Sequence, residues 1–164
     1  MYAGHGYLQE NTKTGYWIPS DAASASPDKW ISNETIARAL GNVPAKQVML
    51  VSDSCYSGSL TREGKVTETV NVSREQLLTQ RSVLAMSSGG EEPVSDEGHD
   101  NHSIFAWNMI RSLNQLSGEI SGQQLHTRIK EAVTKEFPQV PQYGAIVSAG
   151  HKEGGEYLLT PKKN

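Results

Sequence analysis

The stretch VMLVSDSCYSG, residues 48–58, joins an apolar run of strand length to Cys55, the single cysteine among 164 residues. A continuous apolar run of this length is typical of a strand that is buried on both faces, as in a parallel sheet. Small and flexible residues follow the run at once. We therefore expect the thiol at the carboxyl end of a strand, on a turn that a substrate can reach.

A glycine-flanked histidine, His5, lies 50 residues before Cys55 and closes another short apolar segment. An unassisted thiol has a pKa of about 8.5, and a neighbouring histidine can take its proton and later protonate a leaving amine. Parallel neighbouring strands end at the same edge of a sheet. The pattern thus predicts a thiol peptidase site made by His5 and Cys55, with the amides of Gly6 and Cys55 holding the oxyanion.

Other interpretations of the same residues stay open at this point. A lone cysteine after a buried strand is more often an inert core residue, and a lone histidine is usually an ordinary surface residue. A cysteine-dependent phosphatase needs an arginine six positions after its cysteine, whereas Arg62 lies seven positions after Cys55. A third alternative is a module that binds partners without catalysis.

Composition narrows the function classes further. The hydrophobic content is 36%, the net charge is −3 and no basic cluster is present, so we expect no nucleic-acid binding. No apolar run approaches the ~18 residues of a membrane span, and no signal peptide is visible. A single cysteine forms no intrachain disulfide, which favours a reducing, cytoplasmic location. His99 and His102 with nearby aspartates fit no metal pattern, so we expect no metal or cofactor.

The alternation of strands and helices predicts a single α/β domain over residues 1–164. We expect strands near residues 1–5, 16–19, 47–52, 82–87, 143–148 and 156–159, the last two joined by a glycine-rich turn. We expect helices over residues 33–40, 73–80, 103–116 and 121–137, and loops over 7–15, 20–27, 59–72 and 89–102. Asn33 is the expected N-cap of the first helix. Ser121 and Gln124 have the spacing of a capping box at the start of the last helix, which is expected to bury a face that includes Val133 and Phe137.

A histidine-glycine pair after a strand, followed about 50 residues later by Asp-x-Cys-x-Ser-Gly, resembles the caspase-like cysteine peptidases (family C14), for which this spacing is known. The segments YAGHG at 2–6 and DSCYSG at 53–58 are closest to bacterial caspase-like proteins and metacaspases. The chain also resembles later landmarks of the bacterial members, at residues 103–106, 141–144, 150–151 and 154–157. The resemblance covers essentially the whole chain.

The resemblance implies a caspase-like α/β/α sandwich with a mostly parallel sheet. It implies Cys55 as the nucleophile, His5 as the general base, and the amides of Gly6 and Cys55 as the oxyanion hole. The expected activity is that of a cysteine endopeptidase acting on protein or peptide substrates. Some metacaspases need calcium, but no residues here identify its ligands.

Asp53 lies two residues before the predicted nucleophile. Caspases that cut after aspartate carry glutamine at this position, whereas metacaspase-like members carry aspartate and cut after arginine or lysine. A carboxylate attracts a guanidinium or ammonium group and repels an acidic side chain. We therefore expect Asp53, with Asp96 as a second wall, to form a pocket for a basic residue. The alternatives are that Asp53 only caps a turn, that the loop around Asp96 is merely solvated, and that the enzyme is aspartate-specific.

The segment 59–81 corresponds to the region where family members are often cleaved between subunits. Four basic residues of the type that the pocket should accept lie there, namely Arg62, Lys65, Arg74 and Arg81. We expect self-cleavage in this segment.

In the family, two strands and a helix precede the strand that carries the histidine, which here is residue 5. We therefore expect a fragment of a longer protein, or a chain that associates with its missing N-terminal portion or with another chain. A catalytically impaired interaction module is the corresponding alternative function.

Overall fold

The computed structural model describes residues 1–23, 26–54, 60–61, 63–64, 66, 73–90 and 97–162. Four predicted site residues, Cys55, Arg62, Lys65 and Asp96, lie outside these ranges.

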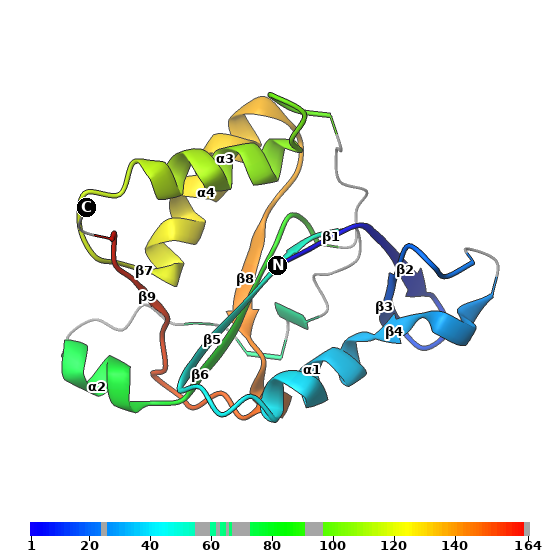
Figure 1. Cartoon of the computed structure of the whole chain (residues 1–164), viewed down its shortest axis with the longest axis horizontal. Helices are drawn as coiled ribbons and strands as arrows, with labels where there is room; N and C mark the ends of the chain where they lie inside the picture. Colours follow the sequence, from blue (N-terminus) through cyan, green and yellow to red (C-terminus); the bar gives the residue numbers. More distant parts are fainter. Residues whose placement is uncertain are drawn as a thin grey trace.

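A four-stranded sheet forms the centre of the molecule, in the order β1-β5-β6-β8 (Figure 1). Its members are β1 (Tyr2–Ala3), β5 (Gln47–Asp53), β6 (Ser82–Ser87) and β8 (Gln142–Ala145). The first three strands run parallel, and β8 is antiparallel to β6. The predicted α/β fold with a mostly parallel sheet is confirmed.

Helices cover both faces of this sheet (Figure 1). On one face, α3 (Ile104–Asn114) and α4 (Gly122–Glu136) pack with Met49, Val51 and Met86 in one hydrophobic cluster. On the other face, α1 (Asn33–Gly41) packs with Val83 and Ala85. Because neighbouring residues of a strand point to opposite faces, the apolar runs of β5 and β6 supply both clusters at once.

The prediction that β5 is buried on both faces is correct in part: each face packs against a hydrophobic cluster, but the strand is not fully covered. Its residues are half-buried, except for the buried Ser52, whereas β6 is buried throughout. The reason is the short neighbour β1, which pairs only with Ser52 and Asp53.

A second sheet, in the order β2-β3-β4, follows β1 directly. It consists of β2 (His5–Gln9), β3 (Thr14–Ile18) and β4 (Ile31–Ser32), with a short 3-10 helix at Pro27–Lys29 before β4. The expected loop over residues 7–15 is therefore wrong, because β2 and β3 form an antiparallel hairpin. Leu8 and Trp17 are buried on one face of it, while His5 and Tyr7 are exposed on the other.

Serine side chains cap the helices. Ser32, not the predicted Asn33, accepts a hydrogen bond from the Thr35 amide at the start of α1. The predicted capping box at α4 is confirmed, since Ser121 and Gln124 exchange both hydrogen bonds. Phe137 ends α4 and is 37% exposed, so its predicted place on the buried face is wrong.

The C-terminal strand β9 (Leu158–Leu159) pairs with β7 (Ile120–Ser121), not with β8 as the sequence suggested. Between β8 and β9 the chain forms a 3-10 helix, Val147–Ala149, and then runs beside the amino end of β6, where the Lys152 amide donates to the Arg81 carbonyl at 3.0 Å. There the Arg81 guanidinium donates to the carbonyls of Val43 and Ala45 at 3.0 and 2.7 Å.

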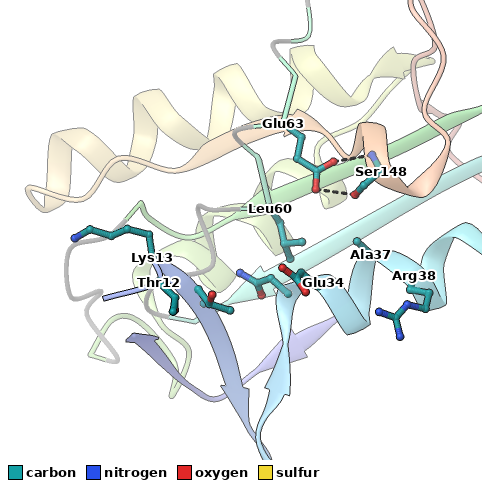
Figure 2. Close-up of a pocket in the computed structure, with 11 residues that line it drawn as sticks. Thr12, Lys13, Glu34, Ala37, Arg38, Leu60, Glu63 and Ser148 are labelled. Atoms are coloured by element: carbon teal, nitrogen blue, oxygen red, sulfur yellow. Dashed lines mark hydrogen bonds between the residues drawn. The ribbon is translucent and has the colours of Figure 1, made fainter. Parts of the chain in front are cut away.

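Part of the expected exposed loop 59–72 is docked on the sheet. Leu60 and Thr61 are only 3% and 8% exposed, and Gly64 forms an isolated bridge with Ala145 of β8. The Glu63 carboxylate accepts from the amide and the hydroxyl of Ser148, both at 2.7 Å, beside a pocket of about 470 Å³ (Figure 2). The pocket lies between the tip of the hairpin and α1, and it contains none of the predicted catalytic or specificity residues.

Candidate active site

The register between β1 and β5 sets the geometry of the candidate site. Ala3 lies opposite Asp53, and the Gly4 amide donates to the Asp53 carbonyl at 3.2 Å. His5 and Cys55 each come two residues after this matched pair. The two strands that precede the predicted catalytic residues therefore end side by side at the carboxyl edge of the sheet, where open α/β sheets place their sites.

Tyr2 holds the chain where it turns from β1 into the hairpin. Its hydroxyl donates to the carbonyl of His5 at 2.8 Å and to that of Ile18 at 3.2 Å. Its ring stacks on Trp17 with centroids 4.2 Å apart, and burial raises the pKa of its phenol. A β-carbon on Gly4 would lie 2.8 Å from the Tyr2 hydroxyl, so this anchor requires a glycine there. His5 itself is exposed, as a group that meets substrate should be.

Asp53 faces the start of α3. The Ser103 hydroxyl donates to Asp53 Oδ2 at 2.5 Å and accepts from the Ala106 amide at 2.9 Å, so one hydroxyl caps the helix and holds the carboxylate. The amino-terminal end of a helix carries partial positive charge, which favours an ionised carboxylate nearby. This half-buried carboxylate is suited to bind a cation that approaches the carboxyl edge of the sheet.

A buried polar network fixes the backbone immediately before residue 55. The Ser54 amide donates to Ser88 Oγ at 3.1 Å, and the Ser88 amide donates to the Ser52 carbonyl at 2.9 Å. The Gln139 side chain in turn donates to the Ser88 carbonyl at 2.7 Å. Ser88 and Gln139 are both fully buried. The segment that leads to the predicted nucleophile is thus held to the end of β6 from within the core.

Two of the four predicted processing residues are described, and their surroundings differ. Arg74 is the first residue of α2 (Arg74–Thr79), and its exposed guanidinium pairs with Glu119 at 2.8 Å. Arg81 directly precedes β6 and donates to several backbone carbonyls, among them that of Leu40 at 3.2 Å. Arg81 therefore stabilises the amino end of the sheet.

Groups that bind metals do not gather in the described residues: no set of three or more histidine, cysteine or acidic side chains is close enough to hold an ion. His99 instead lies 2.8 Å from Glu136, which lowers the pKa of that carboxyl. Within the same ranges, no helix is long and apolar enough to cross a membrane.

A buried ionisable group lies on the α4 side of the sheet, away from the candidate site. Glu156 is 4% exposed, and burial raises the pKa of its carboxyl. It accepts from the Tyr143 hydroxyl at 2.6 Å, and burial raises the pKa of that phenol as well. Glu156 also accepts from the Tyr157 amide at 2.8 Å, so the pair joins β8 to the C-terminal segment.

Sequence reasoning missed the residues that hold the site: Tyr2, Ser88, Ser103 and Gln139. Ser103 had a signal, since it precedes an apolar helical pattern and is a natural N-cap. Ser88 and Gln139 had no such signal in the sequence, because a serine or glutamine in a loop is normally exposed. Only the tertiary structure buries these two residues.

The family model for the caspase domain matches residues 1–148. A search of curated proteins returned no match. The family is one of cysteine peptidases, so the enzyme class that it implies is a hydrolase of peptide bonds. The chain belongs to the caspase-domain family of cysteine peptidases.

Proposed function

We propose that this protein is a cysteine endopeptidase that cleaves after arginine or lysine, with Cys55 as nucleophile and His5 as general base. The observation that carries the proposal is the parallel register of Ala3 with Asp53. Since His5 and Cys55 each follow that register by two residues, a short path for proton transfer between them is expected.

The chemistry follows from these roles. His5 takes the thiol proton, and the thiolate attacks the carbonyl of the scissile bond. The amides of Gly6 and Cys55 stabilise the resulting oxyanion. His5 then gives its proton to the leaving amine, and water hydrolyses the thioester that remains. No metal or cofactor takes part in these steps.

The preference for a basic residue rests on Asp53. Its carboxylate lies beside the N-terminus of α3 and is held by Ser103, so it presents negative charge next to the segment that leads to Cys55. A guanidinium or ammonium group on the substrate gains a charge-assisted hydrogen bond there, whereas an aspartate side chain is repelled. Asp96 is proposed as a second acidic wall of the same pocket.

Two fluorogenic peptides that differ only in a terminal arginine or aspartate test this function. We expect turnover of the arginine peptide, none of the aspartate peptide, and loss of turnover in Cys55→Ala. Cleavage after aspartate alone would contradict the role of Asp53. Folded protein that cleaves neither peptide would favour the alternative, a caspase-like interaction module.

We extend the proposal to self-cleavage within residues 59–81. Of the two described candidates, Arg74 is exposed at the start of a short helix, whereas Arg81 is engaged with backbone carbonyls. Arg74 is therefore the better site of the two, beside Arg62 and Lys65. Intact-mass analysis should show fragments in the native protein but not in Cys55→Ala; full-length chain in both would refute self-cleavage.

A further inference from the structure

A partly exposed aromatic cluster lies on the same face of the hairpin as His5, with Tyr7 exposed and Tyr16 and Trp30 half-buried. Tyr7 and Tyr16 are directly opposite each other on β2 and β3. The Trp30 ring lies 4.7 Å from that of Tyr7 and 5.8 Å from that of Tyr16, between ring centroids. With Gln9 and Pro27, these three rings line a pocket of about 400 Å³. Tyr7 is 44% exposed, so its ring is open to a ligand.

Alternation along β2 places this cluster beside the predicted general base. His5, Tyr7 and Gln9 share one face of the strand, while Leu8 is buried on the other. Two residues of a strand span about 6.6–6.8 Å, which is also the repeat of a substrate bound in extended form. The aromatic pocket is therefore about two substrate residues away from the point where His5 acts.

The rings are held in place rather than free to collapse into the core. The Trp30 indole nitrogen donates to the Ala23 carbonyl at 3.1 Å, and the Tyr16 hydroxyl donates to Gln9 Oε1 at 3.2 Å. The opposite face of the hairpin is already filled by Leu8 and Trp17. An aromatic side chain of a ligand can therefore stack on this surface at little conformational cost.

The proposed chemistry determines whether the substrate residues before or after the scissile bond reach this pocket. Asp53, which receives the residue before the scissile bond, faces α3. Figure 1 shows β2, β3 and β4 beyond β1, away from α3 and α4. His5 lies at the start of this hairpin and protonates the leaving amine, so the residues after the scissile bond pass His5 and continue onto the hairpin.

We propose that Tyr7, Tyr16 and Trp30 form a subsite for a large apolar or aromatic side chain on the leaving-group side of the substrate. This inference rests on the proposed function, because it assumes that His5 and Asp53 take the roles given above. The occupant is a residue of the substrate chain, within about two positions after the scissile bond.

Internally quenched peptides with one arginine test the subsite. Phenylalanine or alanine is placed at the first, second or third position after the arginine, and kcat/KM is measured for each peptide. We expect a preference for phenylalanine of about fivefold to twentyfold at one of these positions, the range for an apolar side chain that is partly buried. The ratio of two peptides on one enzyme is insensitive to the fraction of folded protein.

The variants Tyr7→Ala and Trp30→Ala should bring this ratio close to one, while Tyr7→Phe should keep it. Phe137→Ala is the matched control, since it truncates an exposed aromatic side chain at the end of α4. A flat ratio in the native enzyme, or a ratio that survives both alanine variants, overturns the subsite alone. A second set of peptides carries the same phenylalanine or alanine before the arginine, and a Tyr7-dependent preference in that set overturns the leaving-side assignment. Failure to cleave any arginine peptide overturns the proposed function and the subsite together.

Discussion

The two ends of the central sheet use polar side chains in different ways. At the amino end, Arg81 donates to main-chain carbonyls, and His151 Nδ1 accepts from the Val83 amide at 3.1 Å. These bonds join segments that lie far apart along the chain. At the carboxyl end, Ser88 and Ser103 instead hold the residues around position 55, namely Ser54 and Asp53. The same kind of bond joins distant segments at one end and, under the proposed function, places the catalytic segment at the other.

The substitution Asp53→Asn should have the largest effect on activity. It keeps the size of the side chain and removes the negative charge proposed to bind arginine. We expect kcat/KM for arginine peptides to fall about a hundredfold, as when one partner of a buried charge pair is lost. The melting temperature should change little. An unchanged preference for arginine over neutral residues would mean that Asp53 only stabilises the turn that follows β5.

Arg81→Ala should give the largest effect on stability. It leaves several carbonyls at the amino end without their charged donor, and we expect a loss of about 2 kcal/mol in the free energy of unfolding. Denaturant titration measures this loss. KM for the arginine peptide should stay at its native value in the folded protein. A rise in KM alone would show that the two ends of the sheet are coupled.

Ser88→Ala should lower kcat by about tenfold and leave KM nearly unchanged, because a small displacement of a catalytic group impairs the chemical step more than binding. The variant removes the acceptor of the Ser54 amide. Since Cys55 is the single thiol, its rate of alkylation by iodoacetamide reports on the same site without a substrate. A native kcat in a folded Ser88→Ala protein would refute the positioning role.

Acid should weaken the amino end of the sheet. Burial lowers the pKa of His151, so the unfolded chain binds a proton that the folded chain excludes. Neutral His151 contributes its full share of the free energy of unfolding above the unfolded pKa of about 6.5. This contribution is lost as the pH falls below that value, with a slope of at most about 1.4 kcal/mol per pH unit. His151→Gln should flatten the pH dependence of unfolding between pH 7 and 5. The pH dependence that remains in this variant is expected to come from His126, whose pKa is also lowered by burial. An identical slope in the variant would exclude His151 as its source.

The fold class could be predicted because its signals are local. The apolar run before Ser52, the helical spacing after Ser103 and the capping box at Ser121 each mark their own element. The burial of Leu60 and the pairing of β9 with β7 could not be predicted, since each depends on a partner far along the chain. The hairpin after His5 is local, but its polar sequence resembles a loop. Gln139 could not be predicted as a site residue for the same reason, because its side chain donates to the carbonyl of Ser88, which lies far away in the sequence.

The smallest predicted effect separates capping from positioning. Ser103 and Ser121 each accept from a backbone amide at the start of a long helix, at 2.9 and 3.1 Å. Alanine at either position should cost about 1 kcal/mol of stability through the lost cap. Ser103 also donates to Asp53, so only Ser103→Ala should raise KM for arginine peptides. The expected rise is about threefold to fivefold, because removing one neutral donor from a half-exposed carboxylate weakens its binding of a cation only a little. Ser103→Thr keeps both bonds and should restore KM. Equal KM values in Ser103→Ala and Ser121→Ala would mean that the serine at the carboxyl edge, like those elsewhere, serves only its helix.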